Sequence, residues 1–151
     1  MSYIKPEKRL FTAFSDFYKK LSEGPNSKFN GKAELFVVGL VLGFLNNKRN
    51  TDEKPFEFVR FSHFYDVKRS DLKTIIEMIY TTMAQGKNDN EKWQDMLKIA
   101  DGGIEYLKEH YGKTGDNVDA SILIKDAEKL IDEKGSTWRS ISCRFATIYY
   151  G

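Results

Sequence analysis

The chain has 151 residues, of which 40% are hydrophobic and 30% charged, and its net charge is only +2. This composition is typical of a globular domain and excludes disordered, collagen-like and disulfide-rich chains. A chain of this length buries roughly two thirds of its surface around one core. We therefore expect a single domain over residues 1–151.

The sequence predicts a cytoplasmic protein. Residues 1–9 contain no apolar run typical of a signal peptide. The most apolar stretch, residues 35–45, has eleven residues, whereas roughly 20 are needed to cross a bilayer. The single cysteine, Cys143, can form neither a disulfide within the chain nor a thiolate cluster for zinc. A reducing, cytoplasmic compartment fits these features.

The first third of the chain predicts two helices. Apolar side chains three and four residues apart indicate a helix over about residues 10–21, which a Gly-Pro pair ends. A second helix, about residues 32–47, is apolar almost all round, which is typical of a central helix. Gly39 and Gly43 lie on one face of it, where missing side chains would allow a neighbouring backbone to approach closely.

The middle of the chain predicts an extended segment and a third helix. Residues 56–61 alternate partly between aromatic and polar side chains, which fits a short strand or an extended segment packed on the core. We expect the extended segment, because no other stretch looks like a partner strand. Ser70 and Asp71 predict the start of a helix, with Ser70 as its cap and an apolar stripe up to Met83.

A fourth helix is predicted from a capping-box-like pair, Asn88 and Glu91, to about Tyr111. Gly102 and Gly103 interrupt it, at a cost in helix propensity of about 1 kcal/mol each relative to alanine. Close contact with another helix, most simply its Gly39/Gly43 face, would explain them.

The C-terminal part predicts a fifth helix over about residues 119–131 and an apolar tail, residues 137–151, that docks as a helix or an extended arm. The predicted fold class is therefore all-α. We expect one compact domain of about five to six helices, with a short extended aromatic segment near residues 56–61.

No catalytic or metal-binding constellation can be recognised. His63 and His110 lack metal-ligand spacing to each other or to Cys143, and no glycine-rich phosphate-binding motif occurs. Pairs of acidic residues lie on presumed exposed turns, where carboxylates keep ordinary acidities. We expect no catalytic residues, no metal and no cofactor, and therefore a protein that is not an enzyme.

A polar and basic cluster follows the second helix: Asn47, Lys48 and Arg49. These residues either cap the free carbonyl groups of that helix or bind a phosphate or carboxylate of a partner, for which the arginine fork is suited. Arg60, Lys68 and Arg69 would extend the patch if the aromatic segment folds back alongside it. Three aromatic residues of the tail could serve as interface anchors: Trp138, Tyr149 and Tyr150.

Charge is unevenly distributed along the chain. Residues 1–75 hold 14 Lys/Arg against 9 Asp/Glu, whereas residues 76–151 hold 10 against 13. This difference has two interpretations. The charges belong to ordinary solvated helix surfaces, or the chain is a small DNA-binding protein that uses its basic N-terminal half.

Three stretches together carry a family resemblance. They are the helix ending in Leu42-Gly43-Phe44 with its basic turn Asn47-Lys48-Arg49, the apolar segment 72–83, and the segment 100–107, Ala-Asp-Gly-Gly-Ile-Glu-Tyr-Leu. Taken together they resemble the DNA phosphorothioation-associated protein 4 family, also called dnd system-associated protein 4, which has Asn where this chain has Asp101.

The resemblance covers about residues 10–130. It implies a bacterial anti-phage role beside phosphorothioate-based DNA modification and restriction. The expected function is that of a non-catalytic accessory subunit that contacts other proteins of a defence complex. DNA is a further candidate partner, and neither a membrane nor a small-molecule cofactor is expected.

Overall fold

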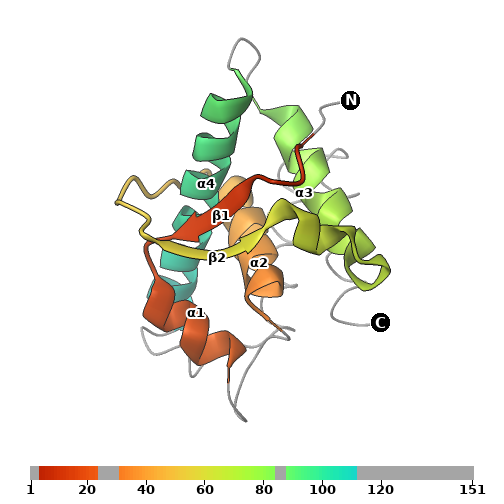
Figure 1. Ribbon diagram of the computed structural model, residues 1–151. Helices are drawn as coiled ribbons and strands as arrows, with labels where there is room; N and C mark the ends of the chain where they lie inside the picture. Colours follow the sequence, from red (N-terminus) through yellow and green to blue (C-terminus); the bar gives the residue numbers. More distant parts are fainter. Residues whose placement is uncertain (1–3, 24–30, 84–87, 112–151) are drawn as a thin grey trace.

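The computed structural model describes residues 4–23, 31–83 and 88–111 (Figure 1). Helical residues make up 68% of them, which confirms a mostly helical fold. The elements follow in the order β1 (Arg9–Thr12), α1 (Ser15–Ser22), α2 (Lys32–Leu45), β2 (Phe56–Arg60), the 3-10 helices η1 (Phe61–Tyr65) and η2 (Val67–Arg69), α3 (Ser70–Thr82) and α4 (Asp89–Tyr111).

Helix α2 lies at the centre of the fold, as its sequence predicts. It is surrounded by α1, α3, α4 and β2, and eleven of its fourteen residues are buried. A helix that is apolar on every side is stable only where other elements cover all of its faces. The two strands cross over α2 and α4 in Figure 1 and cover the side that α1 and α3 leave open.

Helices α2 and α4 touch backbone to backbone at three glycines, Gly39, Gly43 and Gly103. A Cβ on Gly39 would lie 2.7 Å from the carbonyl oxygen of Ala100, and one on Gly43 would overlap the carbonyl of Ile99. From the other side, a Cβ on Gly103 would overlap the carbonyl of Gly39. The distance between packed helices depends on the side chains at the contact, so these glycines permit an unusually close approach.

The predicted pair Asn88 and Glu91 caps the start of α4, with one bond of the capping box formed and the other made between the two side chains. The Asn88 side chain accepts a hydrogen bond from the backbone N–H of Glu91 at 2.8 Å, and donates one to the Glu91 carboxylate at 2.7 Å. Helix α3 also begins where predicted, but Ser70 is not its cap. The residue before its first turn is Arg69, and no side chain caps α3.

The fold is not purely all-α, because β1 and β2 form an antiparallel two-stranded sheet. The predicted first helix is wrong over residues 10–12, which belong to β1, and α1 begins only at Ser15. Residues 56–60, expected as an unpaired extended segment, pair with β1. The partner strand was hidden because Leu10 and Thr12, both buried, fit a period of two as well as the start of a helical stripe.

Four α-helices lie within the described residues. The predicted fifth helix, residues 119–131, and the tail, residues 137–151, lie outside them. None of the helices in residues 4–23, 31–83 and 88–111 is both long and apolar enough to cross a membrane.

The glycine contact predicts a strong dependence of stability on Gly43. Gly43→Ala should lower the free energy of unfolding by about 1–3 kcal/mol, and Gly43→Leu by more, because the added atoms overlap the backbone of α4. Urea unfolding measures both values. The matched control is Gly31→Ser. Its Cβ would meet nothing within 4 Å, and serine is favoured at the start of a helix. Equal stability of Gly43→Ala and the parent would contradict the close contact.

Candidate functional site

The turn after α2 ends the helix in a Schellman motif. Asn47 has a φ of 53°, a left-handed conformation that asparagine tolerates better than most residues. Its N–H donates to the carbonyl of Phe44 at 3.3 Å, and the N–H of Lys48 donates to the carbonyl of Gly43 at 2.8 Å. The structure therefore gives Asn47 a role in closing the helix.

Lys48 and Arg49 both form ion pairs with α4. The Lys48 Nζ lies 2.7 Å from Glu109 Oε2, and this hydrogen bond lowers the pKa of the Glu109 carboxyl. Arg49 contacts both oxygens of Asp95, at 2.9 Å through Nε and at 3.2 Å through Nη2. The fork of Arg49, predicted to hold a partner's phosphate or carboxylate, is filled by the chain's own carboxylate.

The other predicted basic residues lie at the opposite end of α2. Lys68 and Arg69 line a hollow beside Gly31, at the start of that helix, whereas Lys48 and Arg49 follow its end. Fourteen residues of α-helix span about 20 Å. Arg60, at the end of β2, is Arg9's cross-strand neighbour. The structure does not join these residues into one patch with Lys48 and Arg49.

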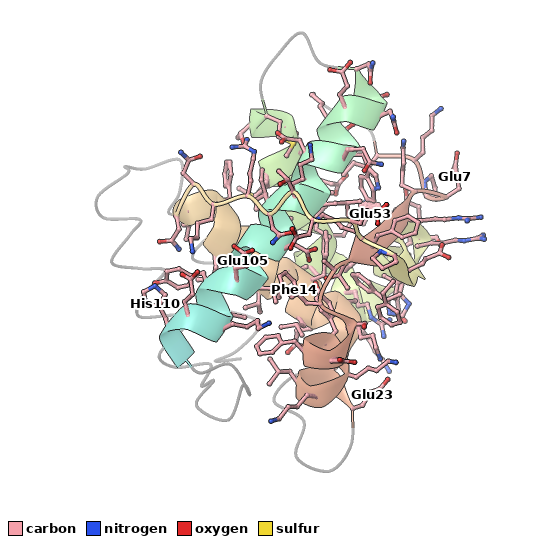
Figure 2. The ribbon with its side chains drawn as sticks, turned by 90° about the vertical axis from the view of Figure 1, so that its left-hand side faces the viewer. Glu7, Phe14, Glu23, Glu53, Glu105 and His110 are labelled. Atoms are coloured by element: carbon pink, nitrogen blue, oxygen red, sulfur yellow. The ribbon has the colours of Figure 1, made fainter. Side chains whose placement is uncertain are left out.

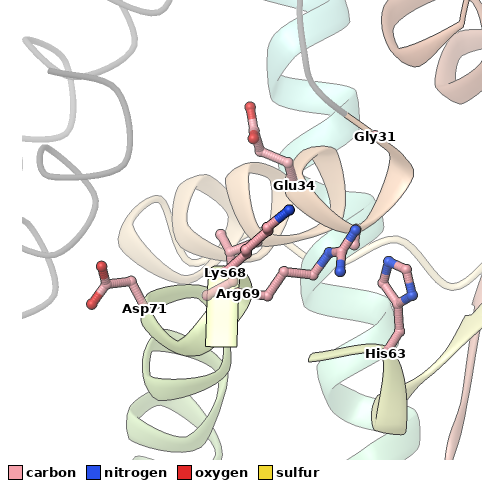
Figure 3. A pocket seen from close by; sticks show the side chains of 8 residues that line it. Gly31, Glu34, His63, Lys68, Arg69 and Asp71 are labelled. Carbon is pink, nitrogen blue, oxygen red and sulfur yellow. The ribbon is translucent and has the colours of Figure 1, made fainter. Parts of the chain in front are cut away.

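The hollow beside Gly31 has a volume of about 370 Å³ and a mixed charge (Figure 3). In Figure 3 the side chains of Arg69 and His63 extend toward each other, while that of Asp71 points away. Partial burial and the nearby Arg69 charge lower the pKa of His63, although Asp66 opposes this shift. Arg69 Nη1 itself lies 3.2 Å from Asp66 Oδ2. Asp66 thus offsets the charge of Arg69, one of the basic groups that line the hollow.

The most connected polar cluster in the described residues surrounds Asp101 in the middle of α4. Its side chain is only 1% exposed. Asp101 accepts hydrogen bonds from the Thr12 hydroxyl at 2.6 Å, from the backbone N–H of Ala13 at 2.9 Å and from Lys54 Nζ at 2.9 Å. Three of the roughly four acceptor sites of this carboxylate are thus used within the chain.

Asn50 connects this cluster to the loop after α2. It is buried, its N–H donates to the carbonyl of Lys98 at 2.9 Å, and its side-chain amide donates to Glu105. The carbonyl of Asn50 in turn accepts from Lys54 Nζ at 2.9 Å. Thr12, Asn50, Lys54, Asp101 and Glu105 therefore clamp β1 and the loop before β2 onto α4; we refer to them as the Asp101 clamp.

Tyr18 of α1 lies close to the clamp without joining it. Its hydroxyl is buried and makes no hydrogen bond with another described residue. Burial raises the pKa of Tyr18 well above its usual value, and the negative charge of Asp101 raises it further. Tyr18 thus stays neutral in the folded protein well into the alkaline range.

Sequence reasoning missed the Asp101 clamp. The signal that could have indicated it is an acidic residue between Ala100 and Gly102, on the stretch of α4 that also carries the close-packed glycines. A carboxylate at such a position needs a buried cation or several donors. Lys54 gave no comparable signal, because it lies in a polar stretch typical of an exposed loop.

The described residues contain no group of three or more His, Cys, Asp or Glu side chains placed to hold a metal ion. The predicted anchors Trp138, Tyr149 and Tyr150 lie outside the described residues. Comparisons with protein-family models, with curated proteins and with solved structures find no match to this chain.

The Asp101 clamp predicts that Lys54→Met is severely destabilising. Removing the cation leaves a buried carboxylate without its charge partner, which typically costs about 3–5 kcal/mol. Adding Asp101→Asn to Lys54→Met should recover part of this loss, since the uncompensated charge is gone. Lys48→Met is the control, because its pair with Glu109 is more exposed and should be worth less than about 1 kcal/mol. Equal losses for Lys54→Met and Lys48→Met in urea unfolding would contradict the clamp.

Tyr18 predicts a loss of stability in alkali. Because its pKa is raised in the folded state, its contribution is complete below its ordinary pKa of 10.0 and is lost as the pH rises above that value. Tyr18→Phe should match or exceed the parent at pH 8, since no hydrogen bond is lost, and should exceed it clearly at pH 10.5. Urea unfolding at the two pH values measures this.

Tyr80→Phe is the control for the tyrosine experiment. The pKa of Tyr80 is also raised, to about 12, chiefly by burial, but its hydroxyl donates to Asp89 at 3.1 Å. This variant should therefore lose stability at pH 8. A Tyr18→Phe variant that loses as much as Tyr80→Phe would show that the Tyr18 hydroxyl makes a bond after all.

Proposed function

We propose that this chain is a non-catalytic accessory subunit of a bacterial anti-phage complex for DNA modification and restriction, of the phosphorothioation-associated kind. It acts by holding other protein subunits rather than by chemistry of its own. The proposal rests on the sequence resemblance, and the fold supplies one observation that supports it.

That observation is the convergence of two stretches that carry the resemblance. Gly43 of the segment Leu42-Gly43-Phe44, and Lys48 and Arg49 of the turn that follows, pack against residues 99–109 of α4, 50 or more positions further along the chain. Glycines meet at the centre of this contact, and the ion pairs of Lys48 and Arg49 lie at its edge. The similar residues thus form one physical unit, which supports a shared fold as the origin of the resemblance.

A surface for protein contact is available on η1 and η2. Among the described residues the large hydrophobic side chains that are exposed are Tyr65, at 44%, and Val67, at 88%. They lie two positions apart in the chain, between His63 and Lys68, which line the hollow beside Gly31. Apolar side chains beside polar ones are typical of the centre and rim of protein interfaces.

The experiment is affinity purification of the tagged chain from its native host after nuclease treatment, with thermal unfolding measured for each variant. We expect the parent to recover subunits of a DNA modification or restriction system. Val67→Asp should reduce recovery about tenfold, the effect of losing roughly 1.4 kcal/mol of binding free energy. Thr51→Asp, exposed in the loop after α2, is the control and should recover as much as the parent. Recovery of no such subunit by the parent would contradict the proposal.

A further inference from the structure

The chain before β1 continues to pair with the chain after β2. The N–H of Phe61 donates to the carbonyl of Lys8 at 2.7 Å, and the N–H of Ser62 donates to the carbonyl of Pro6 at 2.8 Å. Residues 5–9 and η1 therefore lie side by side, as Figure 1 shows for the segments that flank the sheet. Two parts of the chain more than 50 positions apart thus share one surface.

This surface and the η2 segment that follows it in the chain together concentrate positive charge. Residues 5–9 and 60–69 hold six Lys/Arg against two Asp/Glu, a net charge of +4, whereas the whole chain carries only +2. We call five of these side chains the basic face: Lys5, Lys8, Arg9, Arg60 and Lys68. All but Lys8 are exposed, and Lys8 is partly exposed. Within the described part of the chain, ion pairs involve Arg9 alone among the five.

Two arginines of the basic face stand directly opposite each other. Arg9 and Arg60 are partners in the register of β1 and β2, and like charges at such a position destabilise a sheet. Glu57 offsets this only in part, because it contacts Arg9 at 3.2 Å in a pair that is about half exposed. The arrangement costs folding free energy, and an anion from outside the chain would relieve that cost.

The surroundings of the two arginines indicate what kind of anion fits. Protein interfaces place apolar or aromatic side chains at their centre and few charges there. The exposed large hydrophobics of the described chain, Tyr65 and Val67, lie on η1 and η2, next to Lys68 at the edge of the basic face, and not on the strands that carry Arg9 and Arg60. A nucleic-acid backbone, in contrast, is bound mainly through Lys and Arg, and its regularly spaced phosphates suit several separate cations.

We infer that the basic face binds the phosphate backbone of a nucleic-acid duplex. Arg9 and Arg60 contact phosphate oxygens at its centre, and Lys5, Lys8 and Lys68 add contacts around them. Backbone contacts of this kind carry no base specificity. This inference goes beyond the proposed function, which requires protein partners only. It also assigns phosphate binding to these five residues instead of Lys48 and Arg49, whose charges are neutralised by acidic side chains of α4.

The test is binding of fluorescently labelled 20-base-pair duplexes, one of DNA and one of RNA, measured by anisotropy between about 50 and 200 mM KCl. Five phosphate contacts predict a slope of log K against log[salt] of about −4.5. Arg9→Gln/Arg60→Gln should reduce this slope by about two and weaken binding at least tenfold at 100 mM KCl. Its melting temperature should equal or exceed that of the parent, because the repulsion between the two arginines is removed.

The control variant is Lys48→Gln/Arg49→Gln, which removes two basic residues on another part of the surface. Figure 2 shows Glu7 and His110 on opposite sides of the molecule. Glu7 lies within residues 5–9, which carry part of the basic face, and His110 follows Glu109, the ion-pair partner of Lys48. This control should keep the parental slope. Should Arg9→Gln/Arg60→Gln fail to fold, Lys5→Gln/Lys68→Gln takes its place with the same expected change in slope.

Tight binding of either duplex with the expected slopes supports the inference, and the tighter of the two identifies the natural ligand class. Three results would overturn it: no binding at 50 mM KCl, an unchanged slope in Arg9→Gln/Arg60→Gln, or preference for polyglutamate over both duplexes, which would indicate an acidic protein partner. Failure of the nuclease-treated purification, with duplex binding intact, would remove the proposed protein contacts and leave this inference standing.

Discussion

The backbone contact between α2 and α4 determines where the neighbouring segments can lie. With glycine at positions 39, 43 and 103 the two helices approach until carbonyl groups of one meet the Cα positions of the other. Gly102 extends the contact, because a Cβ there would overlap the carbonyl of Lys48 in the turn after α2. This turn is thereby held against α4, which places Asn50 within reach of the Lys98 carbonyl. If the two helices lay further apart, the turn would lose its contact with α4, and Asn50 would no longer reach the Lys98 carbonyl.

The Asp101 clamp depends on that placement and gives the sheet its position. A buried ion pair contributes little net stability compared with apolar packing, because both charges lose their hydration. Its effect here is one of specificity: Lys54 and Thr12 reach Asp101 only when the loop and β1 lie in their observed positions. The backbone N–H of Ala13 completes the set of donors. Packing brings the elements together, and the buried charge selects one arrangement among those that packing would allow.

Two groups of basic residues have different electrostatic environments. Lys48 and Arg49 adjoin in sequence and resemble a binding cluster, yet Glu109 and Asp95 neutralise them from α4. Arg9 and Arg60 are 51 positions apart and are brought together by β pairing, and one partly exposed glutamate, Glu57, pairs with Arg9. Basic residues that are neighbours in the sequence therefore need not form a basic surface. Folding places acidic side chains beside some of them and brings other basic residues together from distant parts of the chain.

The sequence by itself determined the features that depend on local pattern. The all-round apolar character of residues 35–45 indicated a central helix, Asn88 with Glu91 indicated the start of α4, and the spacing of the glycines indicated a close contact. Each follows from interactions within a few turns of helix or from the absence of a side chain. Only the tertiary structure decided the pairing of β1 with β2, the bond between Lys54 and Asp101, and the separation of Lys68 from Lys48 by the length of α2. These features depend on which distant segments come into contact. The free energy that stabilises such tertiary contacts comes from the whole packed core rather than from any short stretch of residues.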